Sequence, residues 1–194
     1  MLKPGLMKGA LRGAVALAAL CAPGALLAQQ SYTITTFAGT GTGTFSGDSA
    51  GATSAEINSP FGIVVNSSGV VTFADQVNHR IRRISGGTIT TIAGKGLAGA
   101  LDSEITVATE ATMTFPSGIA LDSSGNVFYC DTNNHAIYKV TTDGKISKVA
   151  GEGVSGYRTT DEYDSTKTDD ENFLAVEAYL NFPEIGRASC RERG

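Results

Sequence analysis

Two histidines, each following an aspartate, are the residues of this chain best suited to chemistry. His79 lies four residues after Asp75, and His135 lies four residues after Asp131. A histidine near a carboxylate can bind a metal ion or act as a base that the carboxylate orients. Both pairs occupy the same position of a sequence repeat, however, and a catalytic group is needed only once whereas a turn residue is needed in every repeat. We therefore interpret the aspartates as acceptors for backbone N–H groups of a turn that the histidine completes, and we assign no catalytic residue.

Three Gly-x-Gly segments resemble phosphate-binding loops: Gly39-Thr-Gly41, Gly94-Lys-Gly96 and Gly151-Glu-Gly153. None is followed by the Gly-Lys-Ser/Thr sequence and helix that a phosphate loop requires, and the glutamate of the third would repel a phosphate. We interpret them as bends that carry the chain from one repeat to the next. No cofactor is evident from the sequence, although further segments of a longer protein could bring a divalent cation.

Arg80, Arg82 and Arg83 form a basic cluster that the second copy of the repeat lacks. Charged side chains along a strand edge hinder pairing with other chains. The cluster therefore predicts a solvated edge of the folded repeat.

An acidic segment follows the second repeat and is longer than its counterparts. The spacing from the closing glycine to the next proline is 21 residues from Gly39 to Pro60, and 32 residues in this segment, which begins after Gly151. Carboxylates suit hard cations, but the spacing is not that of an EF-hand, so we expect a mobile acidic loop. Long loops on one side of a repeat fold often carry binding specificity. The candidate binding residues of this loop are Asp161, Asp164, Asp169 and Asp170.

These residues are held by a repeat that occurs twice, at about 57–94 and 113–151. Partial copies lie at 32–39, matching the closing strand, and at 180–183, matching the opening. Proline, glycine, aspartate, asparagine and histidine recur at matched spacing in both complete copies. This structural signature is Pro60, Gly62, Asp75, Asn78 and His79 in the first copy, and Pro116, Gly118, Asp131, Asn134 and His135 in the second.

Each repeat divides into four short apolar runs separated by turn residues such as Asp-Gly. Four antiparallel strands in each unit are typical of a propeller blade. The sequence therefore predicts an all-β fold, a partial β-propeller with two whole blades and two partial ones. A β-sandwich or a β-solenoid is the alternative. The three-residue spacing from Ile89 to Ile92 departs from strand alternation and predicts a bulge.

The motifs Pro-x-Gly-Ile, Asp-x-x-Asn-His-x-Ile and Ile-x-x-(Ile/Val)-Ala-Gly-x-Gly resemble the NHL repeat. The segment before the first complete copy is similar to the inter-blade segment of bacterial secreted NHL proteins and of teneurin-type propellers. The resemblance covers about residues 33–183. It implies a propeller, often six-bladed in this family, in which the present blades would be a fragment.

The two ends of the chain differ from the repeats. Residues 1–28 combine basic residues, an apolar run and a small-residue exit, which predicts a signal peptide cleaved near Ala28. A membrane anchor is the alternative, but Pro23 and Gly24 interrupt the apolar run, so we expect no stable anchor. Residues 184–194 resemble the translation of a sequencing-library adapter, and we expect them not to be native.

Between these ends the chain is acidic. Residues 29–183 carry nine basic and seventeen acidic side chains, which leaves a net charge near −8. Such a charge repels nucleic acids and argues against them as partners. Cys130, in an apolar strand pattern, is the single cysteine of this part, which predicts a buried and inert thiol.

These observations favour a secreted or periplasmic propeller that binds a protein or a carbohydrate ligand, more a scaffold than an enzyme. The alternative is a propeller hydrolase or lyase. Lactonase-like and amidating-lyase enzymes are related propellers with an axial metal, and the resemblance would place such a metal in blades outside these two.

Overall fold

The computed structural model describes residues 33–153, 155 and 180–184. The expected signal peptide, the acidic segment and nearly all of the expected non-native tail lie outside these residues. The chain divides into two compact units, 1–35 and 36–194, and every strand belongs to the second.

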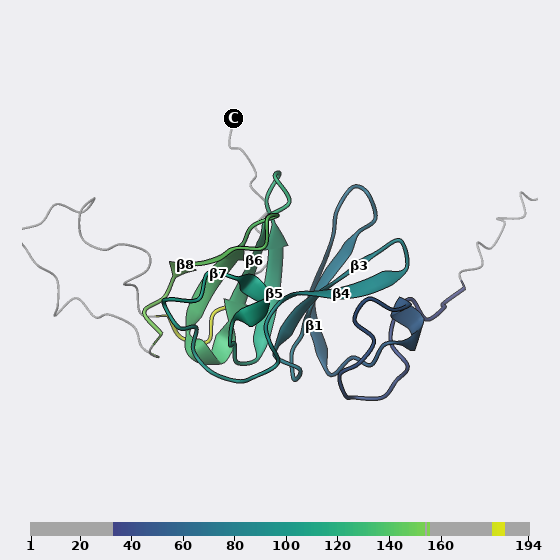
Figure 1. Ribbon diagram of the computed structural model, residues 1–194, viewed down its shortest axis with the longest axis horizontal. Helices are drawn as coiled ribbons and strands as arrows, with labels where there is room; N and C mark the ends of the chain where they lie inside the picture. Colours follow the sequence, from purple (N-terminus) through teal and green to yellow (C-terminus); the bar gives the residue numbers. More distant parts are fainter. Residues whose placement is uncertain (1–32, 154, 156–179, 185–194) are drawn as a thin grey trace, which may run out of the picture. The chain divides into compact units, whose positions relative to one another are not determined.

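Two four-stranded antiparallel sheets make up the fold. The first contains β1 (Pro60–Val65), β2 (Val71–Asp75), β3 (Arg80–Ser85) and β4 (Thr88–Ala93). The second contains β5 (Pro116–Leu121), β6 (Val127–Asp131), β7 (Ala136–Val140) and β8 (Ile146–Ala150). Each sheet keeps its strands in sequence order, and short 3-10 helices lie at η1 (Ala52–Ser54), η2 (Ala108–Glu110) and η3 (Thr132–Asn134). The structure is thus a partial β-propeller, and each sheet is one blade (Figure 1).

The expected bulge lies between the third and fourth strands of each blade. Ile81 pairs with Ala93 and Arg82 pairs with Thr91, so Ile92 is the extra residue. The same shift occurs between Ile137 and Tyr138 in the second blade. The bulge explains the irregular spacing, because Ile89 and Ala93 are buried and Ile92 is only partly so.

The segment that enters each blade covers the outer strand of that same blade. The backbone N–H of Ile89 in β4 donates to the carbonyl of Ala50 (3.1 Å), and the N–H of Ile146 in β8 donates to the carbonyl of Thr106 (2.8 Å). An isolated antiparallel bridge joins Gly51 to Thr88 at this edge. An uncovered outer strand would offer unpaired backbone groups to other chains, and this segment removes part of that edge.

The two blades share one core and meet most closely at their first strands. Ala74 and Ile81 of the first blade pack in the same buried cluster as Met113 and Tyr129. Figure 1 shows the two fans of strands approaching each other at β1 and β5. A Cβ atom on Gly62 would lie 2.5 Å from the carbonyl oxygen of Ser117, closer than real Cβ contacts. The signature glycine is therefore needed for the approach of neighbouring blades, and not for a turn.

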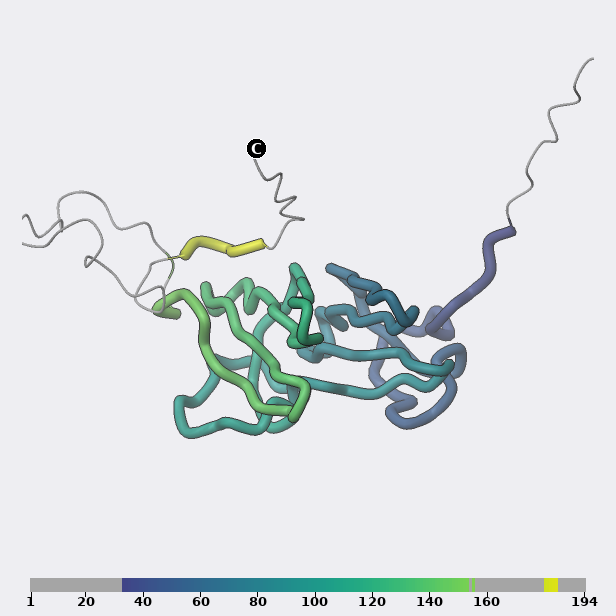
Figure 2. Tube along the Cα trace, turned by 90° about the horizontal axis from the view of Figure 1, so that it is seen from above, coloured from purple at the N-terminus to yellow at the C-terminus, as the bar shows by residue number. Residues whose placement is uncertain are grey.

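The partial copies at the two ends differ in the structure. No strand is assigned to residues 33–39. In a blade the fourth strand pairs with the third, and the described residues contain no third strand with which residues 33–39 could pair. Residues 180–183 do take up repeat positions, because Phe182 has a positive φ of 44° as Phe115 does (54°). Figure 2 shows this short segment in yellow, and it contacts the second blade through His135.

We predict that Gly62→Ala lowers the free energy of unfolding by about 1–3 kcal/mol, because the added methyl group must push β1 away from β5. Urea unfolding measures this. The control is Gly51→Ala, where the new Cβ would lie 3.6 Å from the nearest atom, the Ser54 hydroxyl. Equal stability of the two variants would contradict the close contact.

Candidate functional site

The signature aspartates lie at the ends of β2 and β6 and are completely buried. Asp75 Oδ1 accepts the backbone N–H of Asn58 (2.8 Å) and the side-chain amide of Asn78 (2.8 Å). In the second blade Asp131 accepts the N–H of Thr114 (2.7 Å). The backbone partner is therefore the segment ahead of the first strand, and not the turn that we expected. Each aspartate fastens the start of its blade to the end of the second strand.

The signature asparagines extend this connection to the segment that enters the blade. The Asn78 amide donates to Asp75 and also to the carbonyl of Thr44 (2.9 Å). Asn134 donates to Asp131 (2.8 Å) and to the carbonyl of Gly99 (2.7 Å). An asparagine amide supplies two donors, and both are used here.

The signature histidines join each blade to the next one. His79 has a left-handed φ of 52°, and its Nδ1 accepts the backbone N–H of Phe115 (3.3 Å). The Phe115 ring meets the imidazole edge-on with 5.2 Å between ring centroids. His135 repeats the arrangement with Phe182. Its Nδ1 accepts the Phe182 N–H (3.2 Å), and the two ring centroids are 4.9 Å apart. Because Nδ1 acts as an acceptor, the imidazole of His79 is neutral in this bond. Burial lowers the pKa of His79, and the nearby positive charge of Arg80 lowers it further.

Arg82 is not on a solvated edge, so that expectation for the arginine cluster is wrong. The Arg82 side chain is fully buried, with Nη1 3.3 Å from Asp75 Oδ2 and Nη2 2.9 Å from Asp48 Oδ1. It also donates to the carbonyls of Glu56 and Ser46 (both 2.9 Å). Side chains alternate between the two faces of β3, and the Arg82 side chain lies on the same face of the sheet as Asp75. There its positive charge offsets the carboxylates of Asp75 and Asp48.

Tyr138 replaces this arginine in the second blade. It pairs with Tyr129 across the strands, and the two rings stack with centroids 5.7 Å apart. No cation within the described part of the chain pairs with Asp131. Burial, only partly offset by bonds from Asn134 and Thr114, raises the pKa of Asp131 to about 7. In the first blade burial also raises the pKa of Asp75, against the opposing bonds and charge of Asn78, Asn58 and Arg82.

No group of three or more histidine, cysteine, aspartate or glutamate side chains suited to a metal ion occurs within residues 33–153, 155 and 180–184. Cys130 is buried in β6. Gly94 forms a bend at a positive φ of 90°, where a Cβ atom would lie 2.4 Å from the carbonyl oxygen of His79. The first glycine of this Gly-x-Gly segment is therefore needed for a close backbone approach within the first repeat, where β4 ends beside the start of β3.

A polar groove opens between the two blades, at the end where the β1–β2 and β5–β6 turns lie. Its volume is about 270 Å³. The residues that line it come from both blades: Asn66, Val70, Thr72, Arg83 and Ser85 from the first, and Leu121, Gly125 and Thr142 from the second. None belongs to the repeat signature. This groove is the candidate binding site among the described residues.

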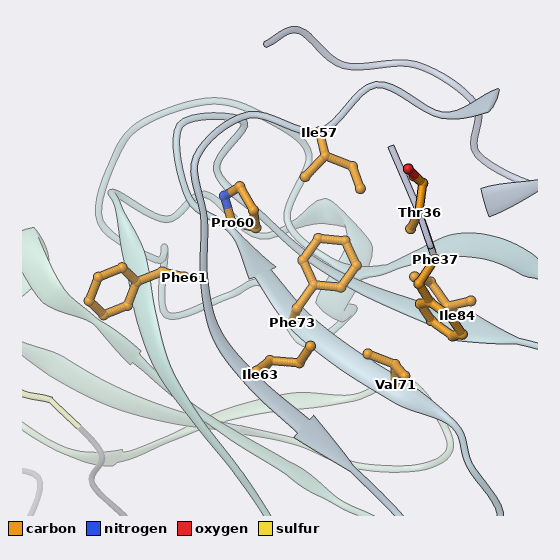
Figure 3. Close-up of a pocket in the computed structure, with 10 residues that line it drawn as sticks. Thr36, Phe37, Ile57, Pro60, Phe61, Ile63, Val71, Phe73 and Ile84 are labelled. Carbon is orange, nitrogen blue, oxygen red and sulfur yellow. The ribbon is translucent and has the colours of Figure 1, made fainter. Parts of the chain in front are cut away.

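A second, apolar hollow of about 380 Å³ lies on the face of the first blade that does not meet the second (Figure 3). Phe73 lies in its middle, with Ile63 and Val71 beside it, and Phe37 contributes from the segment before the blade. Ile63 is 64% exposed. The equivalent face of the second blade is the one packed against the first, so this hollow has the character of a blade-packing surface.

The candidate acidic residues Asp161, Asp164, Asp169 and Asp170 lie outside the described residues. Their predicted role in binding stays a prediction.

No family model matches the chain. Over 80 residues it is 33% identical to the protein SUPPRESSOR OF QUENCHING 1, chloroplastic, of Arabidopsis thaliana, which corresponds to 40% of this chain and 7% of that protein. Among solved structures it is similar to a protein of unknown function from Bacteroides thetaiotaomicron, with a TM-score of 0.51 and 20% identity over 64% of this chain and 28% of the other. An auxiliary nutrient binding protein from Bacteroides ovatus gives a TM-score of 0.49 and 19% identity over 66% of this chain and 31% of the other.

These similarities bear on the fold. The chain spans less than a third of the length of each of these structures. At such identities the match to the Bacteroides thetaiotaomicron structure supports the propeller architecture and carries no information about ligand or reaction.

We predict that Arg82→Leu lowers the free energy of unfolding at pH 8 by about 3–5 kcal/mol, because it leaves buried Asp75 charged without its cation. The loss is smaller at pH 5, since Asp75 can then take up a proton. Urea unfolding at the two pH values checks this. Arg83→Leu, at the next position of β3, is the control and changes stability by about 0.5 kcal/mol or less. A loss for Arg82→Leu that did not depend on pH would contradict the role of the Asp75 charge.

The Asp131 carboxyl is predicted to titrate near pH 7 rather than at its ordinary value of 3.8. Its protonated form is favoured by folding, so its contribution to stability is complete below pH 3.8 and is lost as the pH rises through about 7. The ¹³C resonance of the carboxyl group reports the titration, and Asp131→Asn identifies the signal by its disappearance. A midpoint near 4 would show that the carboxylate is stabilised by groups other than Asn134 and Thr114.

Proposed function

We propose that this chain is part of an exported NHL-repeat β-propeller that binds a protein or carbohydrate ligand without converting it. The observation that carries the proposal is the polar groove between the blades, whose lining residues are distinct from the repeat signature. A concave site with a few converging polar groups is the usual form of a ligand site.

The bonding of the signature residues supports this proposal. Asp75, Asn78 and His79 each bond to the backbone of another segment, and their counterparts do the same in the second blade. Groups that hold every blade together are poor candidates for a single catalytic event. The groove residues Thr72 and Arg83 differ instead between the copies, where Phe128 and Lys139 take their places.

Export is supported by the signal-like pattern of residues 1–28. Within the described ranges, no helix is long and apolar enough to cross a membrane. The acidic residues Asp161, Asp164, Asp169 and Asp170 are a second candidate contact for the ligand, on the loop between the second blade and Pro183.

The alternative is a propeller hydrolase or lyase with a metal site built by further blades. The two functions differ in one measurable way, since an enzyme consumes its ligand and a scaffold returns it unchanged.

The chain, recovered from the periplasm or medium of a bacterial host, is applied to a glycan array and a peptide array. We expect retention of a subset of ligands, recovered chemically intact, and about a tenfold loss of retention for Thr142→Tyr, which fills the exposed rim of the groove. Lys148→Gln, at an exposed position of β8, is the control and retains binding. Conversion of a retained ligand by the wild-type chain, abolished by a substitution within residues 33–183, would instead establish an enzyme.

A further inference from the structure

We propose that the groove between the blades is a carboxylate-binding subsite, with Arg83 as its cation and an acidic monosaccharide unit as its ligand. The inference rests on the proposed binding function and names the class of ligand. It is drawn from a difference between the two blades at matched positions of their sheets.

Arg83 and Lys139 occupy the same place in their blades. Arg83 pairs with Thr72 across β2 and β3, and Lys139 pairs with Phe128 across β6 and β7. A cation is thus present at this position of both blades, although the rest of the arginine cluster is not repeated.

The two cations differ in their counter-ions. In the second blade Lys139 Nζ lies 3.9 Å from Asp122 Oδ2, a carboxylate at the start of the adjacent turn. Asn66 takes the place of Asp122 in the first blade and keeps the same turn bonds, because its Oδ1 accepts the N–H groups of Ser68 (3.0 Å) and Val70 (2.9 Å). The turn geometry is preserved and the negative charge is removed.

Among the residues that the structure describes, Arg83 is consequently a cation without a counter-ion. Within the described ranges its guanidinium makes no hydrogen bond and no ion pair, whereas Arg82 beside it makes both. Arg83 is partly buried and lines the groove. A half-buried guanidinium, planar and with five donors, matches the two oxygens of a carboxylate, and the bond is stronger there than in open solvent.

The remaining wall of the groove suits the hydroxyl groups of a sugar. Thr72, Ser85 and Thr142 are among the lining residues, and none of their three hydroxyls makes a hydrogen bond to another described residue. Leu121 adds an apolar surface for the C–H face of a ring. The volume of about 270 Å³ is just below the range of roughly 300–1,000 Å³ typical of sites for drug-sized ligands, which points to a single small unit.

An acidic peptide fits these observations less well. One common way for a peptide to bind a sheet is to add a strand to its edge. The outer strands β4 and β8 are each already bonded near their first residues to the segments that enter their blades, at Ile89 and Ile146. A glutamate side chain alone would engage Arg83 and leave the three hydroxyls without partners.

Methyl β-D-glucuronide and methyl β-D-glucoside, which differ in the carboxylate, are the probes in an NMR titration of the ¹⁵N-labelled chain. We expect the glucuronide to bind about tenfold more tightly than the glucoside. Arg83→Gln removes the cation, and Asn66→Asp supplies the counter-ion that the second blade already has; each should weaken glucuronide binding about tenfold. Lys148→Gln removes an equal charge elsewhere and should change the affinity by less than about twofold.

Unfolding curves equal to the wild type for Asn66→Asp establish that a loss of affinity is not a loss of structure. Glucuronide binding that neither substitution weakens would overturn the site. Binding of acetyl-Ala-Glu-Ala-amide as tight as that of the glucuronide would overturn the saccharide class and leave a carboxylate site for a protein ligand. If neither carboxylate probe bound, while ligand retention on the arrays was still reduced by Thr142→Tyr, the carboxylate subsite would be overturned and the proposed binding function would stand. Ligand conversion on the arrays would overturn the proposed function itself.

Discussion

The carboxylate at the end of the second strand is the constraint on which each blade depends. Asp75 is buried and must be satisfied, because an unpaired buried carboxylate costs several kcal/mol, on the order of the stability of a small domain. It is satisfied by the backbone just ahead of the first strand and by an asparagine that also bonds to the entering segment. The start of a blade, the end of its second strand and the linker are therefore set by one side chain. The histidine four residues on then uses the same turn to bind the next blade.

The two blades solve the same electrostatic problem in different ways. The first places Arg82 between Asp75 and Asp48, and the second replaces the arginine with Tyr138 and stacks it on Tyr129. The aromatic pair contributes packing but no charge, so among the described residues Asp131 is held by hydrogen bonds without a cation, and burial raises its pKa to about 7. A repeat that is nearly uniform in backbone thus surrounds its buried aspartate in two different ways, with an ion pair in the first blade and with aromatic rings in the second.

Local patterns were sufficient to predict the strands, the turns and the repeat unit, because alternation and Asp-Gly turns act over a few residues. The bulge at Ile92 was also visible as an irregular spacing. The burial of Arg82 was not, since Asp48 and Asp75 approach it from positions 34 and seven residues away along the chain. One signal was available: Arg82 lies two residues before Ile84, and so on the same face of its strand, and the neighbouring strand ends in Asp75. The groove was missed because its lining belongs to two blades and to no motif.

The order of the segments along the chain has a consequence for biogenesis. The residues that bond to the outer strand of each blade precede that blade, since Ala50 accepts the N–H of Ile89 and Thr106 accepts the N–H of Ile146. A polypeptide emerges from the ribosome, and from a translocation channel, with its N-terminal side first. The cover for β4 therefore already exists when β4 arrives, and the same holds for β8. The segment that bonds to each outer strand is thus synthesised before that strand. This order limits the time during which the open edge of a nascent blade could pair with a neighbouring chain.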